Sequence, residues 1–358
     1  MTTKGISEAE LRQKMLEEIL KKKGGGSTAS SSPPPEPEPE VIVEKVVTDD
    51  TKTTLGGIVG MPWDIPIFPP FKPEDWDEKV RCNIPKKDPT YVYGDTYKRF
   101  ATAMSLKMRT MLVGKPGSGK DKAAMQFRAD FNIPYFRITG MRNVTPDMIV
   151  GHFSMEDGSM KWVPGDAEIV CRYGGMLVTS EPGALPPDTG FCLQSAWESP
   201  GYLTILDHPD PRDRMLPLHE NTFLVMTSNV RGFGDDVDKY SATNVMDASF
   251  LNRVESMQYA KVMDAAQQIE ALSKKVPGIA VATMSKMVQF GNLLSTGWDK
   301  NEIEASWSLR NLIAWGRMIH LHGNIVDGFK DTFFDKLSDK EKGTVKGLWR
   351  DVGFRETL

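Results

Sequence analysis

The segment MLVGKPGSGKD, residues 111–121, decides the fold class. Its G-x-x-x-x-G-K spacing follows an apolar run that predicts a strand over 110–113, and it precedes a helical pattern over 121–131. In this context the loop is typical of a phosphate site built from backbone N–H groups and a helix N-terminus, rather than of a simple turn. The residues expected to contact a nucleotide are Gly114, Lys115, Pro116, Gly117, Ser118, Gly119, Lys120 and Asp121.

Two positions depart from the usual form of such a site. Asp121 replaces the Ser or Thr whose hydroxyl normally contacts Mg²⁺, while the strand GGMLVTSEPG ends in Ser180 and Glu181 where Asp-Glu is usual. We interpret this as an exchange in which Asp121 ligates Mg²⁺, Ser180 supports it and Glu181 orients the attacking water. The alternative is decay to a site in which Lys120 holds ATP without hydrolysis.

Three further residues are candidates for the same chemistry. Asn229 follows the apolar run TFLVMTS and is placed to hydrogen-bond the γ-phosphate or the lytic water, although it could merely cap the strand. Arg253, in SFLNRVES, is a candidate finger that enters a neighbouring subunit's site. Arg310, in SWSLRN, opens a helix and is a candidate nucleotide sensor. Each arginine taken alone is more often a surface ion-pair residue.

The rest of the pattern predicts an α/β fold followed by helices. Further strands are predicted over 135–138, 175–179 and 222–227. Their alternation with helices predicts a parallel sheet with helices on both faces. Helical patterns over 266–274, 281–294 and 309–321 predict a separate lid. The predicted domains are an N-terminal region 1–52, a nucleotide-binding domain 53–264 with its lead-in segment, and a helical lid 265–358.

The N-terminal region carries one helical signal and a linker. Ser7 and Glu10 form a capping box that predicts an amphipathic helix over 7–23, which either docks a neighbour or remains a solvated arm. The following GGGSTASSSPPPEPEPE cannot form a packed core, so we expect a disordered linker.

Composition narrows the classes of partner. The net charge of −4, from 44 basic and 48 acidic residues, provides no overall positive potential that would attract the phosphates of a nucleic acid. A translocase would need basic or aromatic side chains along a pore, and Lys161, Trp162, Arg212 and Arg214 could serve. The three cysteines have no C-x-x-C spacing, which argues against zinc and disulfides. No apolar run reaches the roughly 18 to 20 residues of a membrane span, so a cytoplasmic protein is expected.

The order of these motifs resembles the AAA+ family. Two inserted segments, EDGSMKWVPGD and GYLTILDHPDPRDRMLPLHENTFLVM, look like the helix-2 insert and the pre-sensor hairpin of its MoxR and chelatase branch. Met160 and Trp162 in the first insert either touch a substrate or pack the hairpin. The resemblance implies an AAA+ P-loop parallel sheet with flanking helices, β-hairpin inserts and a C-terminal helical lid.

Over about residues 85–354, the chain is similar to the small ATPase subunit of cobaltochelatase, the CobS type. DPTYVYGDTY, RGFGDDVDKYSATNVMDASFLNR and DGFKDTFFDKLSDKEKGTVKGLWRDVGF carry this similarity. It implies ATP and Mg²⁺ as cofactors, a hexameric ring and a partner subunit with a von Willebrand A type domain. Related chains also occur in tailed phages, in which case the host cytoplasm is the expected location.

The function expected from this resemblance is a ring ATPase that hydrolyses ATP to remodel a partner complex. Lys120, Glu181, Asn229, Arg253 and Arg310 match the family pattern, whereas the exchanged pair does not. The alternatives are a nucleotide-gated scaffold with little or no hydrolysis, and a nucleic-acid translocase. Phosphate release beside nucleotide binding separates the first two, and salt-dependent binding of single strands would mark the third.

Overall fold

A computed structural model describes residues 53–231 and 246–358 of the chain. The helix predicted over 7–23, the linker and most of the loop before Arg253 lie outside the described residues. Within the described residues, no helix is both long enough and apolar enough to cross a membrane.

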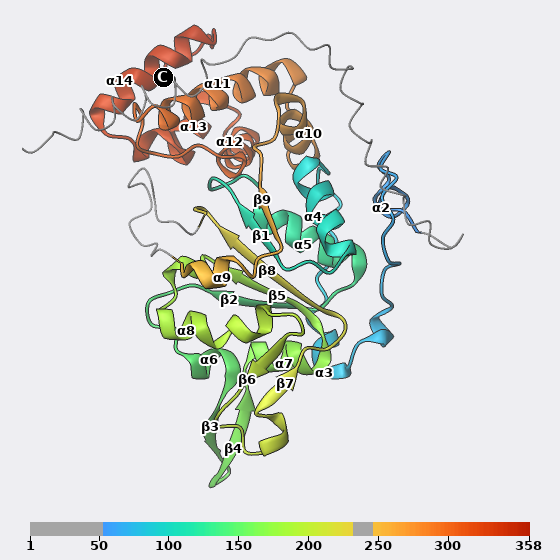
Figure 1. Cartoon of the computed structure of the whole chain (residues 1–358). Helices are drawn as coiled ribbons and strands as arrows, with labels where there is room; N and C mark the ends of the chain where they lie inside the picture. Colours follow the sequence, from blue (N-terminus) through green and yellow to red (C-terminus); the bar gives the residue numbers. More distant parts are fainter. Residues whose placement is uncertain (1–52, 232–245) are drawn as a thin grey trace, which may run out of the picture. The chain divides into compact units, whose positions relative to one another are not determined.

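Five parallel strands form the central sheet, in the order β2-β5-β8-β1-β9 (Figure 1). Their bounds are β1 Thr110–Val113, β2 Tyr135–Thr139, β5 Gly175–Ser180, β8 Thr222–Ser228 and β9 Ser256–Tyr259. Every residue of β1 and of β5 is buried. Because successive side chains point to opposite faces, both faces of these strands must be covered. The predicted α/β class with a parallel sheet is confirmed.

Helices that precede and follow the strands in the sequence surround the sheet. Those of the α/β part are α2 Leu55–Val59, α3 Glu78–Arg81, α4 Asp95–Ser105, α5 Lys120–Phe131, α6 Pro146–Val150, α7 Asp166–Tyr173, α8 Pro187–Cys192 and α9 Ala248–Leu251. Helix α4 packs on β1 and β9, and α7 packs on β2 and β5. The strand β1 and the helix α5 flank the loop at 114–119, as the sequence predicts.

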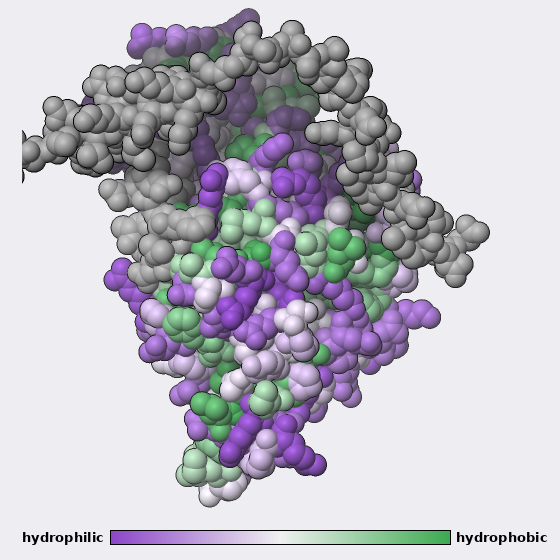
Figure 2. Space-filling model, viewed as in Figure 1, coloured by the Kyte–Doolittle hydropathy of each residue, from purple (hydrophilic) through white to green (hydrophobic). Residues whose placement is uncertain are grey.

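The two predicted inserts form antiparallel hairpins. Their strands are β3 Gly151–Glu156 with β4 Ser159–Pro164, and β6 Tyr202–Thr204 with β7 Met215–Pro217. Buried Glu168 connects the hairpins: its carboxylate accepts a hydrogen bond from Trp162 Nε1 at 2.8 Å and lies 3.5 Å from His208 Nε2. Trp162 is therefore a packing residue, whereas Met160 is 66% exposed. Figure 2 shows hydrophobic residues at the lower end of the molecule, over the hairpin β3–β4.

The C-terminal helices enclose a second hydrophobic core. They are α10 Ala265–Lys275, α11 Val281–Asp299, α12 Leu309–His322, α13 Ile325–Thr332 and α14 Asp339–Asp351. Trp315 and Trp349 are fully buried there, and Trp307 is 8% exposed, so these three tryptophans fill the core of the lid. His322 on α12 lies 3.0 Å from Asp331, and the described residues contain no cluster of three or more His, Cys, Asp or Glu that could hold a metal.

Candidate active site

Three neighbouring strands end at the candidate site. Val113 of β1 is in register with Ser228 of β8, and Ser180 of β5 is in register with Thr227 of β8. The residues that follow these strands therefore lie along one edge of the sheet. In open parallel sheets, ligands bind beyond the carboxyl ends of the strands.

The loop after β1 has the geometry of a phosphate cradle. Gly117 and Gly119 have φ angles of 78° and 88°, the left-handed region that favours glycine. The Ser118 hydroxyl is buried and has no hydrogen-bond partner among residues 53–231 and 246–358. A buried hydroxyl without a partner is costly, and a phosphate oxygen would satisfy it. The loop residues therefore fit the triphosphate of a nucleotide, at the N-terminus of α5.

Lys120 connects this loop to β8. Its ammonium Nζ donates to Gly114 O at 2.6 Å, to Lys115 O at 3.3 Å and to Asn229 Oδ1 at 2.9 Å. Burial lowers the pKa of Lys120, an effect opposed by the nearby carboxylates of Asp121 and Glu181. Lys120 and Asn229, which are 109 residues apart in the sequence, are thus brought into direct contact.

Asp121 and Ser180 meet through a residue that the sequence reasoning missed. The hydroxyl Oγ1 of Thr227 donates to Asp121 Oδ1 at 2.8 Å and lies 3.2 Å from Ser180 Oγ. Both Thr227 and Ser180 are 2% exposed, whereas Asp121 is exposed. The carboxylate of Asp121 and the hydroxyl of Ser180 are oxygen donors, which Mg²⁺ prefers, so this pair fits the ion. The sequence signal that could have identified Thr227 is the alternation of side chains along β8, which puts Thr227 on the same face as Asn229.

Glu181 follows β5 in a left-handed conformation, with φ 50° and ψ 56°. Its carboxylate Oε2 accepts the backbone N–H of Asn229 at 3.3 Å and lies 3.5 Å from the hydroxyl of Ser228. Burial raises the pKa of Glu181, although the Asn229 N–H and the charge of Lys120 act in the opposite direction. The carboxylate is thus held at the strand edge, between β5 and β8.

The two candidate arginines, Arg253 and Arg310, form no hydrogen bond with the site residues described above. Arg253 forms an ion pair with Glu198 at 2.7 Å and donates to Ser249 O at 2.5 Å. Arg310 is exposed on α12. It is not among the residues that line the pocket between the loop and the lid. Within the described residues, neither arginine forms a hydrogen bond or an ion pair with the residues gathered around Lys120, although Ser308, two positions before Arg310, approaches Gly117 of the loop.

The lid covers the loop closely. Lys115 pairs with Asp299 of α11, and a Cβ placed on Gly117 would lie 2.3 Å from Ser308 Cβ. The pocket enclosed between loop and lid has a volume of about 50 Å³. Small-molecule sites usually have about 300–1,000 Å³, so this pocket by itself is too small for a whole nucleotide.

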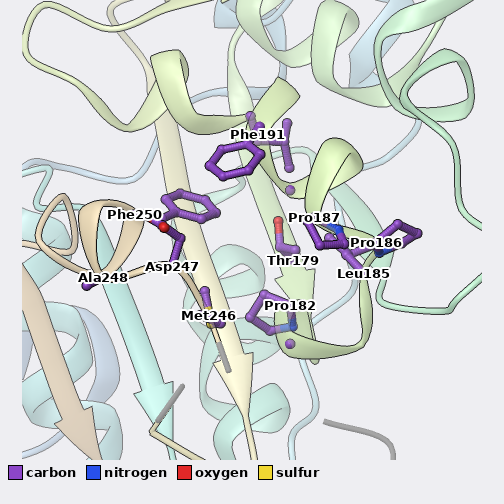
Figure 3. A pocket seen from close by; sticks show the side chains of 13 residues that line it. Thr179, Pro182, Leu185, Pro186, Pro187, Phe191, Met246, Asp247, Ala248 and Phe250 are labelled. Carbon is purple, nitrogen blue, oxygen red and sulfur yellow. The ribbon is translucent and has the colours of Figure 1, made fainter. Parts of the chain in front are cut away.

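A larger cavity of about 490 Å³ lies beside β5 and α9 (Figure 3). Its lining is mainly apolar and includes Pro182, Phe191, Met246 and Phe250. Phosphate needs cationic side chains or convergent N–H groups, and this lining offers no cationic one. The cavity therefore differs chemically from the loop at 114–119: its lining is mainly apolar, whereas the loop is suited to a phosphate.

The chain is similar to several known sequences and structures. The family described as AAA domain (dynein-related subfamily) matches residues 109–191. Aerobic cobaltochelatase subunit CobS from Sinorhizobium sp is 25% identical over 278 residues, covering 73% of this chain and 80% of CobS. The solved Thermotoga maritima RuvB Holliday junction branch migration motor has a TM-score of 0.45 at 14% identity, with 72% of this chain and 74% of that chain covered. A Cytophaga hutchinsonii protein described as an ATPase has a TM-score of 0.41 at 13% identity, with 78% and 94% covered.

Proposed function

We propose that this chain, a AAA+ protein of the MoxR/CobS-like type, hydrolyses ATP with Mg²⁺ and uses the turnover to remodel a partner protein complex. The observation that carries the proposal is the convergence of Lys120, Asp121, Ser180, Glu181 and Asn229 at the ends of β1, β5 and β8. A nucleotide-binding scaffold would need the loop and Lys120, but not a carboxylate held beside Asn229.

In the proposed reaction, a water oxygen bonds to the γ-phosphorus as the bond between that phosphorus and the β–γ bridging oxygen breaks. ADP leaves with the electron pair of that bond, and the proton lost by the water passes to the phosphate product. Glu181 orients the water, and Asn229 donates from its amide to the γ-phosphate or the water. Lys120 exchanges part of its present hydrogen bonding for β- and γ-phosphate oxygens. Asp121 and Ser180 would hold Mg²⁺, which supplies neutralisation of the phosphate charge.

The same proposal includes a hexameric ring. Arg253 reaches the site of a neighbouring subunit after leaving Glu198, and Arg310 senses nucleotide as the lid moves. The relative named as a subunit of aerobic cobaltochelatase supports work on a partner subunit, for which a von Willebrand A type domain is proposed. The exposed hairpin β3–β4 is the element proposed to act on that partner.

The test is Mg²⁺-dependent phosphate release from ATP by the full-length protein, at concentrations that assemble rings. Asp121→Ala should lower the rate about 100-fold while metal-free ATP binding remains. Asp339→Ala is the matched control because Asp339 is also an exposed aspartate in the first turn of a helix, and it should release phosphate normally. Tight ATP binding without turnover by assembled wild-type rings would instead indicate a nucleotide-gated scaffold.

A further inference from the structure

Thr227 stands between the two residues proposed to hold the metal. It belongs to neither the phosphate loop nor the acidic strand end, yet its hydroxyl is 2.8 Å from Asp121 Oδ1 and 3.2 Å from Ser180 Oγ. Asp121 is on the helix after β1, Ser180 ends β5, and β8 runs between those two strands in the sheet. The position of β8 is therefore what allows one hydroxyl to reach both.

Counting protons fixes the direction of this chain of hydrogen bonds. A threonine hydroxyl has one proton to donate, and an ionised carboxylate can only accept. If Thr227 donates to Asp121, its oxygen lone pair is free to accept the proton of Ser180. The sequence of donors is then Ser180 to Thr227 to Asp121. This order leaves a lone pair of Ser180 Oγ and the second oxygen of Asp121 available for a cation.

We infer that Thr227 is a positioning residue for the magnesium site, relaying a hydrogen bond from Ser180 to Asp121 so that both present oxygen lone pairs to the ion; this rests on the proposed function. When a hydroxyl and a carboxylate bind one metal, the hydroxyl proton needs an acceptor that is not the metal. Thr227 supplies that acceptor. Partners that orient ligands in this way typically change metal affinity about 10- to 100-fold when removed.

The burial of Thr227 and Ser180 supports a role for their hydrogen bond in orienting the proposed metal ligands. Thr227 and Ser180 are each 2% exposed, so water competes little for these hydroxyls. A buried hydroxyl that loses its hydrogen-bond partner costs free energy, because water cannot replace the partner. Hydrogen bonds in such a chain also influence one another, so the loss of one changes the geometry of the others. Asp121 is exposed by comparison, so without the Thr227 hydroxyl its carboxylate would be free to turn toward solvent.

The experiment uses the full-length protein and three variants. Thr227→Val keeps the shape but removes the hydroxyl, Thr227→Ser keeps the hydroxyl, and Thr222→Val removes a hydroxyl that bonds Val170 O at the opposite end of the same strand. The first readout is the Mg²⁺ concentration that half-saturates the binding of a fluorescent ATP analogue. The second is binding of Mn²⁺ to the ATP complex, followed by electron paramagnetic resonance. ATP binding in excess EDTA and the melting temperature are measured beside them.

For Thr227→Val, the half-saturating concentrations of Mg²⁺ and Mn²⁺ should rise about 10- to 100-fold while ATP binding in EDTA stays at the wild-type level. Thr227→Ser and Thr222→Val should remain close to wild type in both metals. A merely structural role predicts instead that Thr227→Val loses ATP binding equally with and without metal. That result, an unchanged metal midpoint in Thr227→Val, or failure of serine to restore it would each overturn the inference.

Failure of the proposed function is distinguishable in the same data. A wild-type protein whose nucleotide complex shows no dependence on divalent metal would overturn the magnesium site as a whole, before any variant is compared. A metal-dependent wild type beside an unaffected Thr227→Val would overturn only the role of Thr227.

Discussion

Asp121 and Ser180 are the two residues that we propose to have exchanged roles in the site. The sequence puts a carboxylate where a hydroxyl is usual and a hydroxyl where a carboxylate is usual. The structure joins them through Thr227, with 2.8 Å to the carboxylate and 3.2 Å to the serine hydroxyl. This arrangement supports the interpretation of an exchange over one of decay, since random loss would have no reason to keep a buried chain of hydrogen bonds.

Gly140, directly after β2, sets the position of Glu181. Its N–H donates to Ser180 O at 2.7 Å, and a Cβ placed on it would lie 1.9 Å from Glu181 O. Gly140→Ala should therefore displace the Glu181 backbone, destabilise the fold by about 1–3 kcal/mol and reduce phosphate release more than ATP binding. Urea unfolding, phosphate release and ATP binding measure the three effects.

Gly343→Ala is the matched control for that substitution. Gly343 is inside α14 with nothing within 4 Å of a placed Cβ, so alanine should stabilise the protein by about 0.5–1 kcal/mol and leave turnover unchanged. If Gly140→Ala behaved as this control does, the close approach at Glu181 would have no functional meaning.

At the scale of elements, the lead-in segment before α4 connects the nucleotide-binding helix to the lid. Lys275, the last residue of α10, donates to Asp88 at 2.9 Å and to Thr90 at 2.6 Å. The backbone N–H of Asp88 in turn donates to Gln126 of α5 at 3.2 Å. A displacement of the lid can thus be transmitted to α5 through one short polar segment.

This connection predicts a pH dependence. Burial alone would raise the pKa of Asp88, but hydrogen bonds from Thr90 and Lys275 outweigh it and lower the pKa to about 2. Because this folded-state pKa is below the unfolded value of about 3.9, the stabilisation is fully present above pH 4 and is lost as the pH falls toward 2. Asp88→Asn should cost about 1 kcal/mol at pH 7, after allowance for solvent screening, and the difference from wild type should shrink between pH 4 and 2.

Urea unfolding at pH 7, 4 and 3 measures this difference. Asp339→Asn serves as the reference, since Asp339 is exposed and its nearest lysine, Lys342, is 3.9 Å away. A deficit of Asp88→Asn that stays constant down to pH 3 would contradict the assignment of the stabilisation to the ionised carboxylate.

At the scale of the whole molecule, the described chain gathers the loop, the acidic strand end and Asn229, and Arg253 pairs instead with Glu198. Arg253 is bound to Glu198 and is 27% exposed at its side chain. Such a partly exposed ion pair is worth little, so a neighbouring subunit's phosphates can compete for the guanidinium. Among the basic residues of the inserts, Arg212 pairs with Asp210 at 2.6 Å and Lys161 lies 3.5 Å from Glu156, whereas Arg214 donates to the backbone oxygen of His208 at 3.3 Å.

If Arg253 acts in the site of a neighbouring subunit, mixing two inactive variants should restore part of the phosphate release. Arg253→Ala and Lys120→Ala should each lower phosphate release by about 1,000-fold or more, because each lacks one part of every site. Mixed rings should regain measurable activity, since an Arg253→Ala subunit retains Lys120 and can receive Arg253 from a Lys120→Ala neighbour. Phosphate release across mixing ratios is the measurement.

The control for mixing is Arg212→Ala, which removes an exposed arginine at 88% side-chain exposure and should leave the rate unchanged. Absence of recovery at every mixing ratio, with mixed assembly verified by differently tagged subunits, would place Arg253 in a role confined to its own chain.

The sequence by itself determined the class of fold and most elements of the site. The strand β1 begins and ends where the apolar run 110–113 predicts, and α5 begins one residue before the predicted 121. Periodicity, glycine spacing and strand-terminal polar residues are local signals, because they reflect backbone sterics and one-sided burial within a few residues. For the same reason, Lys120, Asp121, Ser180, Glu181 and Asn229 could all be proposed from their immediate contexts.

Only the tertiary structure decided how these pieces meet. The order β2-β5-β8-β1-β9 places β8 between the strands that precede Asp121 and contain Ser180, and that order alone gives Thr227 its two partners. The pairing of Arg253 with Glu198 likewise joins residues 55 positions apart. Such contacts depend on which strands and loops become neighbours through the packing of the whole core, and no short stretch of sequence contains that information.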